Sequence, residues 1–299
     1  MRFAFTEDQR LFGRAVRDVL GGDGPVWQAL ADVGLLGAHV PEEYGGLGLT
    51  PVDTVLAYEE TGRFAVTGPV VETAVVAPPL VPADRLPGIV AGGLVVSARP
   101  GTGLLPHADT AALLVVEAGR DTVVVEPEKA VLTPRPSIDP SRPMFADDLP
   151  SGSVPGAAFD HAAVAVSAQL VGLGRRLCAE TVAYAGRRHQ FGRAVGSFQA
   201  VKHRLADVAV GLEFAAPLVY KAAFTLSPRD VSAAKVAAGR AAHQAARAAL
   251  QVHGAIGYTE ELDLHRRLKR VWALRTEWGD ERFHKARIRA ALYGCSEIA

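Results

Sequence analysis

The chain has 299 residues, and its 32 Lys and Arg balance its 32 Asp and Glu, so its formal net charge is zero. A neutral chain has no overall field that attracts polyanions, which argues against nucleic acid as the main partner. Hydrophobic residues make up 49% of the chain, which excludes a disordered protein and is enough for a sizeable core.

Residues 1–90 have the pattern of a helical domain. Thr6 and Gln9 have the spacing of a capping box, and apolar residues follow at helical spacing, so a helix is expected to start there. Further helices are expected over residues 26–35 and 51–64. The glycine-rich turn between them matches no dinucleotide-binding motif and follows no strand.

Residues 91–158 change character. Short β-branched runs at 94–97, 111–116 and 122–125 are separated by Gly, Pro and Asp. This pattern predicts a small antiparallel β module. The proline-rich stretch 134–155 has few periodic positions and is expected to be loop.

Residues 159–299 return to long helices. The expected helices cover 162–186, Ser197 to about 225, Ser227 to Gly254, 263–278 and 280–293. The order helical, β, helical has no βαβ alternation, which excludes a Rossmann or barrel design. The sequence therefore predicts a mostly α fold with a small central antiparallel β module.

Cysteine content and the N-terminal sequence bear on the compartment of the protein. Cys178 and Cys295 lie far apart and form no CxxC pair, which favours a reducing compartment. The first residues lack the apolar core of a signal peptide, and no run approaches 18 consecutive apolar residues. We expect a cytoplasmic protein with no membrane partner. The nine histidines show no metal-ligand spacing, so no metal site is expected.

The most informative stretch, residues 187–207, follows the first long helix of the C-terminal region. An Arg at a helix end, followed by a glycine turn, can present a forked guanidinium to a phosphate. Phe191 supplies a flat apolar surface, while Gln190 and Gln199 supply amide donors and acceptors. Taken alone, an Arg-rich turn is more often a solvated surface.

The whole stretch resembles the R-x-x-F-G signature of the acyl-CoA dehydrogenase family, flavoproteins that oxidise acyl-CoA thioesters. Residues 5–9 resemble the family's N-terminal helix, and residues 40–49 resemble its P-E-E-Y-G-G turn. Residues 251–258 resemble its Q-x-x-G-G segment, in which Ala255 replaces a glycine, and residues 267–270 resemble the helix that follows. The resemblance implies a helical, β, helical subunit that binds FAD in an extended shape between subunits.

The resemblance also implies which residues contact FAD. Arg188 and Gln190 would contact the pyrophosphate region, with Phe191 packing beside it. The other candidates, from a second flavin-contacting pair and from a strip donated by the neighbouring subunit, are Phe198, Gln199, Gln251, Gly254 and Ala255. The nearest match to the family's segment over the flavin ring is residues 97–103, in a β zone that we expect to be shortened relative to the family.

Acyl-CoA dehydrogenases remove the α proton of the thioester with a carboxylate while a hydride leaves the β carbon for the flavin. The usual position of this base falls on Trp278, and the alternative position falls on Ala162, so neither side chain can accept a proton. The neighbouring family Arg falls on Ala163. The candidates for a displaced base are Glu277, one helical step of roughly 100° away, and Asp160, which also suits substrate contact or helix capping.

These observations leave three hypotheses open. The first is the non-catalytic partner in a heteromeric acyl-CoA dehydrogenase, of the kind found in bacterial steroid degradation, whose Arg188 region completes the FAD site of the active chain. The second is a self-sufficient homodimeric flavoenzyme with a displaced carboxylate. The third is a flavin-free scaffold or acyl-CoA-binding protein. The expected partners are another acyl-CoA dehydrogenase subunit in a dimer or tetramer, an acyl-CoA substrate and electron-transfer flavoprotein.

Overall fold

The computed structural model describes residues 4–101, 103–118, 121–150 and 157–294. Its helices are α1 (Glu7–Leu20), α2 (Val26–Asp32), α3 (Pro51–Arg63), α4 (Leu86–Val90), α5 (Ala157–Arg187), α6 (Gln199–Thr225), α7 (Pro228–His253), α8 (Leu264–Thr276) and α9 (Glu281–Tyr293). Its strands are β1 (Val96–Arg99), β2 (Leu105–Pro106), β3 (Leu113–Ala118), β4 (Asp121–Val125), β5 (Thr133–Arg135), β6 (Met144–Ala146), β7 (His189–Gln190) and β8 (Arg193–Ala194). The mostly α fold in helical, β, helical order is confirmed.

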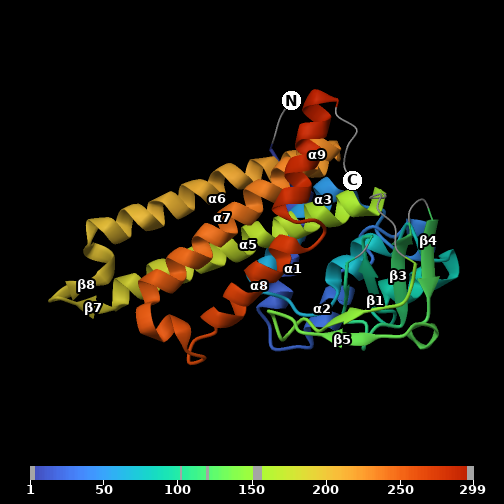
Figure 1. Cartoon of the computed structure of the whole chain (residues 1–299), viewed down its shortest axis with the longest axis horizontal. Coiled ribbons are helices and arrows are strands. Elements are labelled where there is room, and N and C mark those ends of the chain that lie inside the picture. The colour runs from blue at the N-terminus through green and yellow to red at the C-terminus, as the bar shows by residue number, and fades with distance from the viewer. Residues whose placement is uncertain (1–3, 102, 119–120, 151–156, 295–299) are drawn as a thin grey trace.

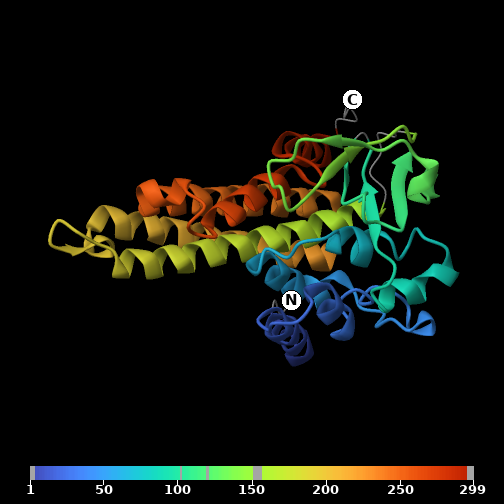
Figure 2. The same ribbon diagram turned by 90° about the horizontal axis from the view of Figure 1, so that it is seen from below.

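The molecule is elongated, with its mass gathered at one end (Figures 1 and 2). The N-terminal helices and the small sheets lie at that end, and α5, α6 and α7 extend away from it as a long bundle. The main hydrophobic core joins buried residues from α1 through β1 and β3 to α8. A smaller core in the β region contains Leu105, Ala108, Leu114, Val116 and Phe145. The division into domains at residues 90 and 158 stays a prediction.

Local capping signals set several helix ends where the sequence indicated. The Thr6 hydroxyl accepts a hydrogen bond from the Gln9 backbone N–H at 3.3 Å, and the Gln9 side chain accepts one from the Thr6 N–H at 2.9 Å. Ser227 caps α7 in the same way, by accepting from the Asp230 N–H at 3.2 Å, and Gly254 ends that helix at φ +65°. These ends follow from short-range chemistry.

The cap expected at Ser197 is wrong. Ser197 lies in a short 3₁₀ turn, where its hydroxyl donates to the Ala194 carbonyl oxygen at 2.7 Å. The residue that caps α6 is Phe198, which makes no side-chain capping bond. The serine sits one residue too early because the 3₁₀ turn uses its hydroxyl before the α-helix begins.

The β region differs from the expected antiparallel module in one pairing. β3 pairs with β4, and β6 pairs with β2 and β5, all antiparallel, whereas β1 and β3 are parallel. The chain leaves β1, passes through β2 in the second sheet, and returns to pair with β1 in the same direction. The stretch 134–155, expected to be loop, contains part of β5 and all of β6, and its residues 151–155 lie outside the described part.

Within the described part of the chain, α6 alone is long and apolar enough to cross a membrane, and 39% of its apolar window is buried. Its inner face, with Leu205 and Leu212, packs into the bundle against α5 and α7. Its outer face exposes Val210, Phe214 and Leu218. The buried face is that of a core helix, and the exposed stripe is a surface that another protein chain can cover.

Candidate functional site

The strands β7 and β8 lie at the far end of the bundle (Figure 1). Arg188, Gln190 and Phe191, in and beside these strands, are all exposed. β7 and β8 form a hairpin whose two-residue turn is Phe191-Gly192, with φ values of +53° and +78°. Positive φ at both positions is the geometry of a type I′ turn, and it is unusual for a bulky residue such as Phe. The turn leaves the Phe191 ring 91% exposed, projecting from the bundle.

The second candidate strip lies at the same end of the bundle, where α7 finishes. Gln251 and Ala255 are exposed, and Gly254 is half-buried. The Tyr184 ring, one turn before Arg188 on the chain, stacks on the His253 ring with centroids 4.1 Å apart. The structure therefore brings together two strips that lie more than sixty residues apart in sequence.

Phe198 and Gln199 belong to the hairpin's own packing. The Arg193 guanidinium lies 4.0 Å from the centre of the Phe198 ring, and the Phe191 ring meets Phe198 edge-on at 6.2 Å. The Gln199 amide lies 3.5 Å from the His203 Nε2. Part of this pair's role is thus to hold the hairpin against the start of α6.

These residues fit a cofactor that carries phosphates and a flat ring. Among the described residues, Arg188 makes no ion pair or side-chain hydrogen bond, so its guanidinium is free for an oxyanion. The outward Phe191 ring and the exposed Gln190 and Gln251 amides lie on the same end of the bundle. All of them face outward, so they can enclose such a group only together with another surface.

A groove of about 700 Å³ runs between α6 and α7. Its ionisable lining residues are His203, Arg204, Asp207, Arg240, His243, Arg247, Arg275 and Glu281. Four guanidiniums face two carboxylates, and Arg240 already pairs with Glu281 at 2.6 Å. The groove has a positive balance that suits an anionic surface or group.

The two positions where the family places its base are inside the protein. Trp278 is 2% exposed and packs edge-on against the Phe159 ring at 5.9 Å. Ala162 and Ala163 are fully buried on α5. Both positions are thus occupied by apolar side chains of the hydrophobic core.

The turn that carries Trp278 is strained and firmly held. Trp278 has φ +49°, and its backbone carbonyl bonds the His284 Nε2 at 2.9 Å. The buried Lys235 donates to the carbonyl oxygens of Arg275 at 3.1 Å and Gly279 at 3.0 Å. Burial lowers the pKa of Lys235 to about 7 and, with help from nearby cations, that of His284 to about 3. These contacts fix where the neighbouring Glu277 points.

Asp160 is occupied by an ion pair. Its two carboxylate oxygens accept from the Arg287 guanidinium at 2.7 and 3.0 Å. Arg287 is 9% exposed and comes from α9, so the pair joins the two ends of the C-terminal region. Asp160 lies inside the first turn of α5, where it forms this bridge.

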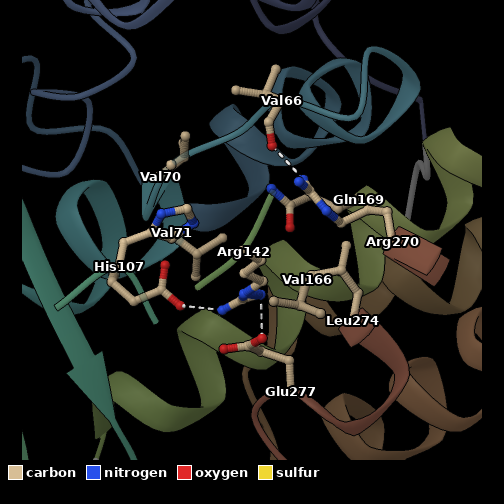
Figure 3. Close-up of a pocket in the computed structure, with 12 residues that line it drawn as sticks. Val66, Val70, Val71, His107, Arg142, Val166, Gln169, Arg270, Leu274 and Glu277 are labelled. Carbon is tan, nitrogen blue, oxygen red and sulfur yellow. Dashed lines mark hydrogen bonds and ion pairs between the residues drawn. The ribbon is translucent and has the colours of Figure 1, made fainter. Parts of the chain in front are cut away.

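Glu277 points into a polar cavity of about 20 Å³ (Figure 3). It forms an ion pair with Arg142, whose guanidinium also contacts the Glu72 carboxylate at 3.2 Å. Arg270 closes the far side by pairing with Asp139 at 2.5 Å. The cavity has room for one water molecule and none for a thioester.

Burial dominates the electrostatics of this cavity. It raises the pKa of Glu72 to about 7, against the pull of Arg142 and with the repulsion of Glu277. It lowers the pKa of His107 to about 4, and Arg142 adds to this effect. Sequence analysis missed Glu72 and Arg142. One signal was present for Glu72, which is a single carboxylate inside the apolar run 70–76.

Residues 97–103, the nearest match to the family's flavin-ring segment, lie in and after β1. Ser97 is fully buried and donates to the Pro106 carbonyl oxygen at 2.6 Å. Arg99 forms two hydrogen bonds to Asp147, at 2.7 and 2.8 Å. Residue 102 lies outside the described residues, as does Cys295. The Ser97 and Arg99 side chains therefore bond to other residues of the β region.

Comparison with known proteins agrees with this geometry. The family model described as "Acyl-CoA dehydrogenase, N-terminal domain" matches residues 15–83. The model described as "Acyl-CoA dehydrogenase, C-terminal domain" matches residues 153–293. Acyl-CoA dehydrogenase IpdE2 of Mycobacterium tuberculosis is 32% identical over 84% of this chain and 81% of its own length. IpdE2 of Mycolicibacterium smegmatis is 29% identical over 93% and 91%.

Solved structures share the fold across nearly the whole chain. A glutaryl-coenzyme A dehydrogenase in complex with glutaryl-CoA has a TM-score of 0.84 at 20% identity, over 98% of this chain and 97% of that chain. The ChsE4-ChsE5 complex of Mycobacterium tuberculosis gives 0.83 at 21% identity, over 99% and 100%. With the domain matches and the identity to IpdE2, these findings show that the chain belongs to the acyl-CoA dehydrogenase family, whose members are FAD-dependent oxidoreductases.

Proposed function

We propose that this chain is the partner subunit, without a catalytic base, of a two-subunit acyl-CoA dehydrogenase that oxidises the α,β bond of an acyl-CoA thioester. One observation carries the proposal: both family base positions are apolar and buried, Trp278 at 2% exposure and Ala162 at 0%. General-base catalysis needs a proton acceptor within hydrogen-bond reach of the substrate, and neither side chain is one.

The remaining carboxylates are engaged elsewhere. Glu277 is bound to Arg142 beside a cavity of about 20 Å³, and Asp160 is bound to Arg287. A carboxylate held by a buried guanidinium is a poor base, because protonation would leave the cation uncompensated. What this chain contributes is therefore binding and assembly.

FAD, when bound, supplies the hydride acceptor of the reaction. In this chain Arg188 would bind its phosphates, and Gln190, Phe191 and the strip around Gln251 would bind the rest of the exposed cofactor surface. The support is their shared location at the end of the bundle and the free guanidinium of Arg188. Because all of these groups face outward, we infer that they complete an FAD site on a second subunit.

Structural relatives support a two-chain assembly and a class of substrate. One solved neighbour is a complex of two proteins, ChsE4 and ChsE5, and another is the Tcur3481-Tcur3483 steroid acyl-CoA dehydrogenase, with a TM-score of 0.79 at 23% identity. We propose a steroid-derived acyl-CoA as the substrate class. Electron-transfer flavoprotein is the proposed electron acceptor, and the cytoplasm the proposed compartment.

The assembly is tested by co-expression with a dehydrogenase subunit that carries the base. We expect the two chains to co-purify as a yellow complex, because the exposed stripe of α6 and the outward FAD-contacting residues both need a partner surface. Light scattering should give a mass of at least a dimer. A colourless monomer at micromolar concentration, with or without FAD and with or without the second chain, would favour the flavin-free scaffold.

Arg188→Ala is expected to weaken FAD retention in the assembled complex. A charge-assisted contact to phosphate contributes about 1.5–3 kcal/mol, so the affinity should fall roughly ten- to hundredfold. Flavin fluorescence titration of the deflavinated complex measures this loss. Arg289→Ala is the control, since Arg289 is exposed on α9. Equal affinity for FAD in the two variants would show that Arg188 is a solvated residue that does not contact the cofactor.

A further inference from the structure

Two buried carboxylates, those of Glu72 and Glu277, share the guanidinium of Arg142. The Arg142 Nη2 lies 3.2 Å from the Glu72 Oε1, and its Nη1 forms an ion pair with Glu277. The three side chains are 4%, 11% and 7% exposed. They come from the π-helical turn Glu72–Val76, from the turn between α8 and α9, and from the segment before β6, and they line the same cavity. Figure 3 shows Arg142 and Glu277 in it.

Among the described residues, Arg142 is the only cation that forms an ion pair with Glu72. Arg270 and Asp139 neutralise each other at 2.5 Å. His107 is neutral because burial and Arg142 lower its pKa to about 4. Lys235, behind the turn, donates to backbone carbonyl oxygens at 3.0 and 3.1 Å; its ammonium is attracted by Glu277 and Asp280, while burial lowers its pKa to about 7. Arg142 can therefore balance only one of its two carboxylates, and an unbalanced buried charge is costly.

We propose that Glu72 and Glu277 hold one proton between them, so that Arg142 binds one carboxylic acid and one carboxylate. The proton belongs on Glu72, which is the more buried of the two. Two carboxyl groups at one site cannot both ionise without strong repulsion, and one of them then keeps its proton to a higher pH. Burial raises the pKa of Glu72 to about 7, in agreement with this assignment.

The cavity beside the cluster has room for one water molecule. The Arg142 Nε is buried and has no hydrogen-bond partner in the described structure. The cavity of about 20 Å³ beside it is polar and large enough for one water. A water there would accept from the Nε–H and donate to the carboxyl groups, which would satisfy the last donor of the guanidinium.

The shared proton makes the cluster sensitive to pH. Above about pH 7 the proton leaves, and two like charges then compete for one guanidinium. The contact that ties the Glu72–Val76 turn to the α8–α9 turn weakens, and Trp278 follows Glu277 directly in that second turn. The protonation of this cluster thus controls how firmly the turn that contains Trp278, the family's base position, is held.

Proton linkage sets the sign of this effect on stability. In the unfolded chain Glu72 ionises near 4.5, and in the folded chain near 7. As the pH rises from about 4.5 to 7 the unfolded state loses its proton first, so the folded state becomes relatively less stable. Buried neutral histidines such as His107 and His284 act in the opposite direction over the same range. The test must therefore compare a variant with the parent chain.

Glu72→Gln is that variant, because an amide mimics the protonated carboxyl. The unfolding constant of the parent divided by that of Glu72→Gln should rise on the order of 50-fold between pH 5 and pH 8. Glu60→Gln is the matched control: Glu60 is equally buried but contacts two guanidiniums, those of Arg17 and Arg63. For this control the same ratio should stay constant over that range, whatever its effect on stability.

Infrared spectroscopy of the native parent chain gives a second measurement that needs no stable variant. We expect a carbonyl band of a protonated carboxyl at pH 6 that disappears by pH 9, and that is absent at pH 6 in Glu72→Gln. A parent spectrum without that band, or a stability ratio for Glu72→Gln that does not change with pH, would show that both carboxylates are ionised and overturn the proposal.

Discussion

The purified chain alone is expected to dehydrogenate acyl-CoA thioesters at least about 10²–10⁴-fold more slowly than a complex that contains a base-bearing subunit. The reason lies in where the carboxylates are. Trp278 and Ala162 fill the two family positions from inside the core, while Glu277 and Asp160 are each bound to a buried guanidinium. Turnover should be measured with an artificial electron acceptor on short-chain, long-chain and steroid-derived thioesters.

Two substitutions identify a displaced base if one exists. Glu277→Gln and Asp160→Asn should leave the low activity of the isolated chain unchanged. Robust turnover by the isolated chain that either substitution abolishes, with the fold intact by circular dichroism, would establish the self-sufficient enzyme instead. Ala162→Glu is not expected to restore activity, because residue 162 is fully buried and the new carboxylate would have no solvent.

Local chemistry explains which parts of the fold were predictable from sequence. The Thr6 capping box, the Ser227 cap and the terminal Gly254 each act on the helix end where they lie, and the structure has all three as expected. The prediction that Ser197 caps α6 was wrong because the 3₁₀ turn before α6 uses the serine hydroxyl. The parallel pairing of β1 and β3 had no local signal, since it depends on where the chain goes between them.

The same distinction holds for the site. The candidates around Arg188 and Gln251 were found because they form contiguous motifs, although only the fold shows that both strips occupy one end of the bundle. The cluster of Glu72, Arg142 and Glu277 joins residues 70 and 135 positions apart. No pattern of spacing connects such residues, and they meet only because the β region folds onto the α8–α9 turn.

Gly172→Ala is expected to destabilise the folded chain by about 3 kcal/mol or more, the largest stability loss among these variants. α3 and α5 cross with their backbones in contact at this point. A Cβ on Gly172 would lie 1.8 Å from the Glu59 carbonyl oxygen, and a Cβ on Gly62 would lie 2.0 Å from that of Gln169. A backbone carbonyl cannot rotate away as a side chain can, so the two helices must separate along their whole contact.

Gly186→Ala in the same helix is the matched control, because a Cβ there would meet no atom within 4 Å. It should stabilise the chain slightly, by about 0.5–1 kcal/mol, since alanine restricts the unfolded chain without a clash. Urea unfolding of the two variants should therefore shift the midpoint in opposite directions. Equal shifts of the urea midpoint would mean that the effect comes from replacing glycine with alanine in a helix and not from a clash between α3 and α5. Opposite shifts would show that the close crossing of α3 on α5 causes the loss at Gly172.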